Sequence, residues 1–265
     1  MNTTAIITAV IVIALLGLIL GLFLGFSAKA FHVETDPREE KITGTLPGNN
    51  CGGCGYPGCS GLAAAIVAGD APVNGCPVGG EAVAKKVAEI MGVDAGESIR
   101  MVAFVRCAGD CEQAGRDYEY HGEQDCRMAM FLPGGGEKSC NFGCLGYGSC
   151  VSACPFDAIH VEKGIAVVDK EACKACGKCV EACPKKLIEL IPYDAKYAVA
   201  CASKDKGPDV MKKCKTGCVG CMLCKKNCPK EAVEIADFLA HIDQEKCEGC
   251  GACAEKCPKK VIVKL

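Results

Sequence analysis

Three stretches of the sequence repeat one cysteine spacing, in which gaps of two, two and three residues separate four cysteines and proline follows the last. The stretches contain Cys173, Cys176, Cys179 and Cys183, then Cys218, Cys221, Cys224 and Cys228, then Cys247, Cys250, Cys253 and Cys257. Three cysteines at this spacing can ligate one [4Fe–4S] cluster from a single loop, while the fourth ligates the neighbouring cluster. The spacing therefore predicts one-electron chemistry at pairs of [4Fe–4S] clusters.

In a pair of such runs, each fourth cysteine ligates the cluster of the other run. This rule predicts which residues hold each cluster. In the C-terminal pair, the expected ligand sets are Cys218, Cys221, Cys224 and Cys257, and Cys247, Cys250, Cys253 and Cys228. In the upstream pair, they are Cys173, Cys176, Cys179 and Cys154, and Cys140, Cys144, Cys150 and Cys183. The last set departs from the regular spacing, because both gaps before Cys150 are wider.

A further group near the N-terminus has its own spacing. It consists of Cys51, Cys54, Cys59 and Cys76, with Pro77 after the last cysteine. Several glycines surround these cysteines and allow backbone N–H groups to turn toward the sulfurs of a cluster. We expect a fifth [4Fe–4S] cluster here; zinc held by four cysteines is the alternative.

Five cysteines remain outside these groups. Four of them could ligate a sixth cluster where the upstream and C-terminal cluster pairs meet: Cys107, Cys126, Cys201 and Cys214. The alternative is that they are buried or free thiols. The fifth, Cys111, lies in a polar stretch and is expected to be exposed and left over, with no role predicted. The expected cofactors are thus five or six [4Fe–4S] clusters.

Composition excludes several other classes of protein. The chain has 265 residues and 25 cysteines, an odd number that fits poorly with a framework of disulfides. The four histidines are scattered, no glycine-rich dinucleotide-binding frame is present, and no Ser-His-Asp arrangement has a supporting context. No catalytic residue and no cofactor beyond the clusters is therefore expected.

Charge is unevenly distributed along the chain. The formal net charge is −2, but residues 138–265 carry a surplus of lysine while the first half is acidic. Since the chain has no tryptophan and few aromatic residues for base stacking, an acidic protein is a better partner than nucleic acid. The alternative is that the lysines only offset the negative charge of bound clusters.

An uncharged run of residues, 5–26, is long enough to cross a bilayer as one helix. Basic residues follow this run and none precedes it, which predicts a single-pass anchor in the cytoplasmic membrane with the cluster domains in the cytoplasm. Gly17, Gly21 and Gly25 share one face of the helix, where another membrane helix could pack closely.

The remaining sequence predicts an α+β fold with tandem two-cluster ferredoxin-like modules. The cysteines around Cys154–Cys183 recur 74 residues later, which indicates a duplicated unit, and short apolar stretches at Ile159 and Ile165 predict hairpin strands. A helix is expected within residues 78–100. The expected domains are 1–27 (anchor), 28–46 (linker), 47–100 (N-terminal cluster domain), 101–195 (bridging segment and first module) and 196–265 (second module).

The whole chain resembles the B subunit of the Rnf complex. The resemblance rests on the anchor, the motif from Cys51 to Cys59 (CGGCGYPGC), the motif from Cys140 to Cys150 (CNFGCLGYGSC) and the ferredoxin repeats. It implies an electron-carrying subunit of an ion-translocating ferredoxin:NAD⁺ oxidoreductase. In such a complex soluble ferredoxin is the donor, and other membrane and peripheral subunits reduce NAD⁺ and pump Na⁺ or H⁺.

Three alternatives stay open at this point. Two are redox proteins: a component of a SoxR-reducing complex and a polyferredoxin of a membrane hydrogenase. The third is a zinc-binding interaction protein without redox activity. The pumped ion, the cluster potentials, the path and the physiological direction of electron flow are not predicted by the sequence.

Overall fold

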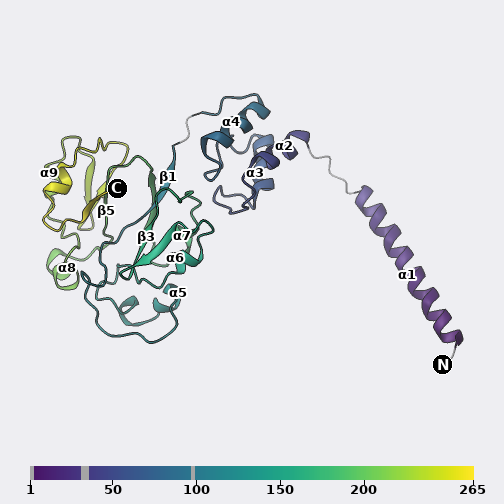
Figure 1. The fold of residues 1–265 in the computed structure, drawn as a ribbon, viewed down its shortest axis with the longest axis horizontal. Helices are drawn as coiled ribbons and strands as arrows, with labels where there is room; N and C mark the ends of the chain where they lie inside the picture. The colour runs from purple at the N-terminus through teal and green to yellow at the C-terminus, as the bar shows by residue number, and fades with distance from the viewer. Residues whose placement is uncertain (1–2, 31–35, 97–98) are drawn as a thin grey trace.

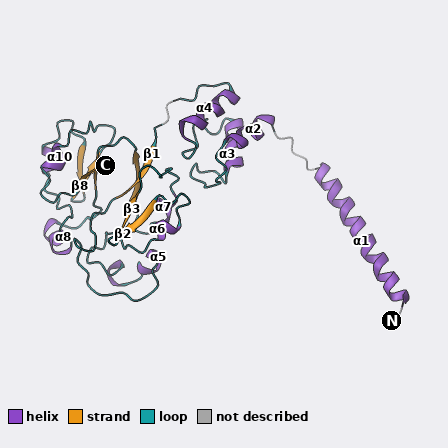
Figure 2. Cartoon of the chain, viewed as in Figure 1, coloured by secondary structure: helices purple, strands orange, loops and turns teal. Residues whose placement is uncertain are grey.

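The computed structural model describes residues 3–30, 36–96 and 99–265. The residues between these ranges are drawn as a thin grey trace in Figure 1. Part of the predicted linker, including His32, lies outside the described residues. The described chain contains a long N-terminal helix, a small helical domain and a larger region with short strands (Figures 1 and 2).

The first helix, α1 (Thr3–Ala30), contains the predicted apolar run. Its segment Val10–Ser27 has a mean hydropathy of 2.8, and none of that segment is buried in the structure. Within the described residues it is the one helix long and apolar enough to cross a membrane. Large side chains such as Leu22 and Phe23 are exposed along it, as a helix surrounded by lipid requires.

Three helices form the small N-terminal domain: α2 (Pro37–Thr45), α3 (Cys59–Ala68) and α4 (Gly80–Met91). Their shared core includes Ile42, Leu62, Ile66 and Val87, all of which are almost completely buried. The helix predicted within residues 78–100 is present as α4. Glycines in the left-handed conformation end both α3 and α4, where a residue without Cβ is favoured.

The predicted linker, residues 28–46, is corrected by this packing. Residues 37–45 form α2, which begins at Pro37 after the N-cap residue Asp36. The Asp36 carboxylate accepts a hydrogen bond from the backbone N–H of Arg38 at 2.8 Å. Because Ile42 is fully buried against α3 and α4, this segment is part of the domain core. Ile42 and Leu46 are the two buried apolar residues that the structure describes in this charged stretch, too few for the sequence to predict a helix there.

The first module has two antiparallel strand pairs. Strands β2 (Ile159–Glu162) and β3 (Ile165–Val168) form the predicted hairpin, with Ile159 opposite Val168. Strands β1 (Met101–Val105) and β4 (Ile188–Pro192) pair across the whole module. Two short helices carry cysteines between these strands: α6 (Ser149–Ser152) and α7 (Lys178–Ala182).

The second module repeats this arrangement. Its hairpin is β6 (Val233–Ala236) and β7 (Leu239–Ile242), and its outer pair is β5 (Tyr197–Val199) and β8 (Ile262–Lys264). The corresponding helices are α9 (Leu223–Lys226) and α10 (Ala252–Glu255). Each module has its own core of buried aliphatic and cysteine side chains, which lies between its two strand pairs.

A bridging segment joins the modules. It contains α5 (Cys126–Ala129) and the 3₁₀ turn η1 (Pro133–Gly135), while α8 (Gly207–Lys213) belongs to the second module. An isolated β-bridge pairs Ala114 with Cys214, and a second pairs Arg116 with Lys138. The Lys138 ammonium also donates to the carbonyl of Gly164 in the first module at 2.7 Å. The segment therefore contacts both modules and brings distant cysteines to their boundary.

Candidate iron–sulfur centres

Four cysteines of the first module line one cavity, which we call group I: Cys154, Cys173, Cys176 and Cys179. This is the crossed set that the regular spacing predicts. The backbone N–H of Ala103 donates to the Sγ of Cys173 at 3.4 Å, and the N–H of Ala158 donates to the Sγ of Cys154 at 3.5 Å. Such donors offset negative charge on thiolates that ligate a cluster.

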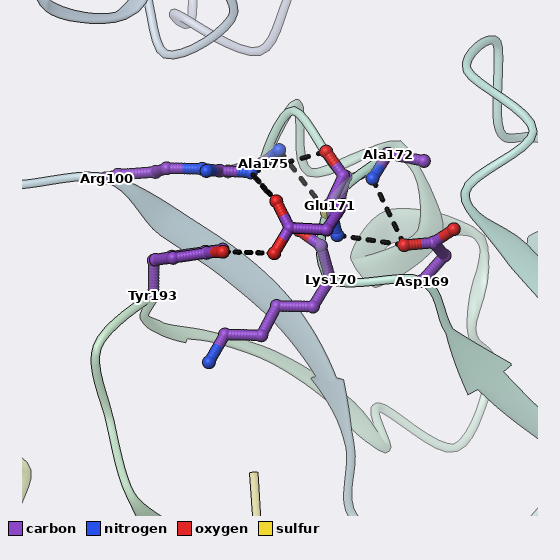
Figure 3. A network of polar contacts seen from close by, with 8 residues as sticks. Arg100, Asp169, Lys170, Glu171, Ala172, Ala175 and Tyr193 are labelled. Carbon is purple, nitrogen blue, oxygen red and sulfur yellow. Dashed lines mark hydrogen bonds and ion pairs between the residues drawn. The ribbon is translucent and has the colours of Figure 1, made fainter.

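A polar network fixes the start of the group I loop (Figure 3). The Asp169 carboxylate accepts backbone hydrogen bonds from Glu171 at 2.8 Å and Ala172 at 3.2 Å. The Arg100 guanidinium donates to the carbonyl of Glu171 and lies over the Tyr193 ring, 3.7 Å from its centroid. Because Tyr193 and Arg100 flank β4 and β1, the cysteine loop is tied to the outer strand pair.

The second module contains two comparable groups. Group III consists of Cys218, Cys221, Cys224 and Cys257, which line one cavity. In group IV, burial raises the pKa of Cys253, and the nearby charges of its companions raise it further: Cys247, Cys228 and Cys250. Both arrangements match the sets predicted from crossed ligation. Each group takes three cysteines from its own loop and one from the run that belongs to the other.

Group II differs from the predicted set. One cavity is lined by Cys126, Cys144, Cys150 and Cys183, with Lys185 beside them. The sequence placed Cys140 here instead of Cys126. Burial raises the pKa of Cys150 to about 12, and the charges nearest to it are those of Cys144, Cys126 and Cys183. Cys126 is therefore the fourth member of this group, and Cys140 is not.

Cys140 belongs instead to a group at the boundary of the modules, which we call the bridge group: Cys107, Cys140, Cys201 and Cys214. The sequence placed Cys126 in this group. The close approach depends on Gly109, since a Cβ atom there would lie 3.3 Å from the Sγ of Cys214 and 3.8 Å from the Sγ of Cys107. Burial raises the pKa of Cys201 to about 11.

The 74-residue repeat explains the exchange of Cys126 and Cys140. Shifted by 74 residues, Cys144 and Cys150 correspond to Cys218 and Cys224, and Tyr147 corresponds to Cys221. The first module therefore lacks its second loop cysteine, and Cys126, from outside the loop, lies in the cavity in its place. The same shift relates Cys140 to Cys214, which both belong to the bridge group. Aligning the repeats residue by residue would have given this signal.

The N-terminal group lies around the start of α3. Cys54, Cys59 and Cys76 pack against the same core, and their proximity contributes to the raised pKa of Cys76, whose largest cause is burial. The backbone N–H of Cys59 donates to the Asn50 side chain at 2.8 Å, which fixes the loop at the helix start. Cys51 lies on the side facing the first module, close enough for its charge to act on Cys176.

These groups are suited to clusters better than to zinc. A zinc ion requires four sulfurs at about 2.3 Å from one point. In groups I, II and III and in the bridge group, the four cysteines instead line a cavity. The donor set of four cysteines around one cavity is that of a [4Fe–4S] cluster.

One cysteine stays outside all six groups. Cys111 is exposed, as the sequence predicted, and its backbone N–H donates to the carbonyl of Lys163 at 2.9 Å. Cys111 lies beside the β2–β3 turn. It does not line the cavity of group I, group II, group III or the bridge group.

Backbone contacts link the groups in a fixed order. The N–H of Cys218 in group III donates to the Sγ of Cys201 in the bridge group at 3.4 Å. The N–H of Cys144 in group II donates to the Sγ of Cys107 in the bridge group, also at 3.4 Å. Crossed cysteines join group III to group IV and group II to group I. The resulting order is group IV, group III, bridge group, group II, group I and the N-terminal group.

A membrane-type helix followed by several ferredoxin-like cysteine groups defines an iron–sulfur electron-transfer protein. Family models agree with this class. An Fe-S cluster model matches residues 46–78, and two 4Fe-4S dicluster domain models match residues 137–184 and 217–261.

Relatives identify the family more narrowly. The chain is 43% identical to the B subunit of the ion-translocating oxidoreductase complex of Methanosarcina acetivorans, over 83% of both chains. It is 48% identical to the B subunit of the Na⁺-translocating ferredoxin:NAD⁺ oxidoreductase complex of Acetobacterium woodii, over 83% of this chain and 66% of that protein. The proton-translocating counterpart from Clostridium ljungdahlii is 44% identical, over 82% of this chain and 76% of that protein.

The chain belongs to the family of B subunits of ion-translocating oxidoreductase (Rnf) complexes. The resemblance inferred from the cysteine motifs is thereby confirmed. A SoxR-reducing or hydrogenase role is not favoured, because these relatives are named for ion-translocating complexes. The chain spans just under two thirds of the Acetobacterium relative.

Proposed function

We propose that this chain is the electron-carrying B subunit of a membrane-bound ferredoxin:NAD⁺ oxidoreductase that translocates ions. In this role it accepts electrons from reduced ferredoxin and passes them toward membrane subunits that reduce NAD⁺. The observation that carries the proposal is the continuous series of six cysteine groups, in which each group is linked to the next by a backbone contact or by cysteines of one run. The names of two relatives supply the donor and acceptor. Those relatives differ in the ion they translocate, and no described residue of this chain distinguishes Na⁺ from H⁺.

We assign one [4Fe–4S] cluster to each of the six groups, and such clusters supply one-electron redox chemistry when bound. The chain contributes four thiolates to each site, and backbone N–H donors to thiols in groups I to IV and the bridge group. Burial raises the pKa of many of these thiols, so assembly of a site releases protons as the sulfurs become ligands. Cluster assembly is therefore expected to weaken as pH falls.

The protein environment also separates the sites from water. Cys144, Cys150, Cys173 and Cys179 are buried in the first module, together with the aliphatic side chains of its core. Lys138 is almost completely buried near the bridge group, and its ammonium donates to the carbonyls of Gly109 at 3.0 Å and Gly164 at 2.7 Å. A fixed positive charge beside the bridge group stabilises electron density there.

The anchor and the charge distribution suggest an orientation. We propose that α1 spans the cytoplasmic membrane once and that the cluster domains lie in the cytoplasm, because the basic residues follow the helix. The N-terminal group then remains near the membrane, and the second module is the part that meets a soluble donor. Electrons would enter at the second module and leave past the N-terminal group.

The test uses membranes from cells that lack this chain and from cells complemented with it. Complemented membranes should catalyse NAD⁺ reduction by reduced ferredoxin, and the purified chain should contain about 24 irons, at four for each cluster. Ferredoxin-dependent NAD⁺ reduction that persists without the chain would contradict the proposed role. Stoichiometric zinc in place of iron would contradict the cofactor assignment.

A further inference from the structure

Two positions in the second module carry large apolar residues where the first module has glycine. Shifted by 74 residues, Met222 corresponds to Gly148 and Phe238 corresponds to Gly164. Met222 precedes α9, within the group III loop, and Phe238 lies in the turn between β6 and β7. At both positions, a glycine of the first module is replaced by a large apolar residue.

The backbone at both positions disfavours this replacement. Gly148 and Gly164 have φ angles of 78° and 75°, and Met222 and Phe238 keep the same left-handed conformation, with φ of 61° at each. Glycine adopts this region without a steric cost, whereas a side chain with Cβ clashes with its own backbone. The unfavourable conformation is therefore tolerated at two neighbouring sites that both carry apolar side chains.

Both residues are only half buried. Met222 is 50% exposed and Phe238 is 49% exposed, so neither contributes fully to the core of its module. Leu223, the next residue in the loop, is also exposed. Because large apolar side chains in solvent do not stabilise the fold, a backbone strained to present them indicates a contact surface.

This surface lies directly over group III. Cys221, which precedes Met222, is one of the exposed cysteines of the six groups. The Sγ of Cys218 lies 3.8 Å from the carbonyl oxygen of Phe238, so the β6–β7 turn contacts the same group. Met222 also lines the cavity of group III together with Lys259. We call Cys221, Met222, Leu223 and Phe238 the group III face.

Lysines surround the group III face. Lys225 and Lys226 follow in α9, and neither is in an ion pair among the residues that the structure describes. The Lys204 ammonium contacts the Asp237 carboxylate at 3.0 Å, next to Phe238. An apolar centre with a basic rim and an exposed cluster ligand is complementary to an acidic protein that presents its own redox centre.

The corresponding surface of group IV also has an exposed cysteine, Cys250, but it lacks the large apolar residues. Gly251 precedes α10 as Met222 precedes α9, with a φ of 79°. A Cβ atom on Gly251 would lie 2.6 Å from the Tyr197 hydroxyl, so a larger residue cannot take the place of Gly251 without displacing Tyr197. Among the described residues, no large apolar side chain is exposed in residues 247–257, so the apolar contact surface is specific to group III.

We infer that the group III face is the docking site for a small acidic electron-carrier protein. This inference rests on the proposed function and names the surface that serves it. One electron leaves the reduced partner and enters this chain; no covalent bond forms or breaks. Met222 and Phe238 act as positioning residues, because they exclude water and bring the partner's redox centre close to Cys221.

The test replaces both residues by glycine, as found in the first module, in the full chain loaded with clusters. M222G/F238G should lower the second-order rate constant for reduction by a reduced acidic ferredoxin, and weaken ferredoxin binding, each by about ten-fold. Its iron content and its reduction by dithionite should remain those of the wild type. F131A is the matched control, since Phe131 is 87% exposed in the bridging segment.

A second variant tests whether the loss comes from the missing apolar side chains or from the greater flexibility of a glycine backbone. M222N/F238N keeps a side chain that tolerates the left-handed conformation but removes the apolar surface, and it should show the same loss as the glycine variant. Wild-type rates with ferredoxin in both variants would overturn the docking site, as would equal slowing with dithionite. If ferredoxin fails to reduce the wild type while dithionite succeeds, the proposed function itself fails, and the docking site with it.

Discussion

Gly53 lies against Cys176: a Cβ atom on Gly53 would be 2.5 Å from the carbonyl oxygen of Cys176. The loop of the N-terminal group therefore touches the loop of group I through bare backbone. No side chain separates the two loops at this point. This contact connects the small helical domain, which follows the membrane helix, to the first module.

Replacing Gly53 by alanine should separate these loops. The added methyl group cannot fit against Cys176 without a shift of the backbone, so the two groups should move apart. We expect ferredoxin-dependent NAD⁺ reduction by the membrane complex to fall by at least about ten-fold, since a small misplacement has large kinetic effects. Iron content should not change. Gly44→Ala in α2 is the control, because nothing lies within 4 Å of its added Cβ; equal activity of the two variants would contradict the role of the contact.

The membership of Cys126 and Cys140 can be tested by comparing double variants. C126S/C150S removes two cysteines from group II, so it should lose about four irons per chain, no more than either single variant. C140S/C150S affects the bridge group and group II, so it should lose about eight. Iron content and electron paramagnetic resonance measure these losses. A loss of about eight irons in C126S/C150S and about four in C140S/C150S would instead support the set predicted from spacing, in which Cys140 and not Cys126 joins Cys150.

Crossed ligation in the second module can be tested in the same way. C228A/C253A should lose about four irons, because both residues belong to group IV. C228A/C218A should lose about eight, because Cys218 belongs to group III. The spectrum of C228A alone should retain the group III signals. Loss of group III alone in this variant would show that the cysteines are not exchanged between the runs.

The glycine face of α1 is expected to contact another membrane helix. Gly21→Leu should reduce co-purification of the partner subunits several-fold while the chain still inserts, because leucine is apolar but prevents close approach. Deletion of residues 1–27 should instead give a soluble chain that keeps its clusters. Leu20→Ile, next to Gly21, is the control for a change of apolar shape. Unchanged co-purification of the Gly21→Leu protein would count against a glycine interface.

The lysines of the second module should accelerate the encounter with an acidic donor. Reversal of Lys225, Lys226, Lys259 and Lys260 to glutamate should slow reduction by ferredoxin ten-fold or more at low salt, chiefly through the association rate. Added salt should slow the wild type as well, since exposed charges are screened over about 10 Å at 0.1 M. Lys41→Glu/Lys86→Glu in the N-terminal domain is the control. A wild-type rate for the quadruple variant at low salt would mean that these lysines only balance cluster charge.

The sequence by itself determined the features that depend on short distances along the chain. Cysteines two residues apart must lie in one loop, so the triads around Cys176, Cys221 and Cys250 followed from spacing, as did the hairpin at Ile159 and Ile165. The apolar helix followed from a continuous run of uncharged residues. Local backbone geometry is sufficient for each of these features.

Only the tertiary structure decided which distant cysteines meet. Cys126 reaches group II from outside its loop, and Cys107 and Cys201 meet Cys140 and Cys214 because the modules pack against each other. Likewise, the burial of Ile42 and the exposure of Phe238 depend on neighbours far away in sequence. Such contacts result from the packing of whole elements, and the spacing within one cysteine run carries no record of them; the 74-residue repeat, which relates Cys140 to Cys214, is the one signal along the chain.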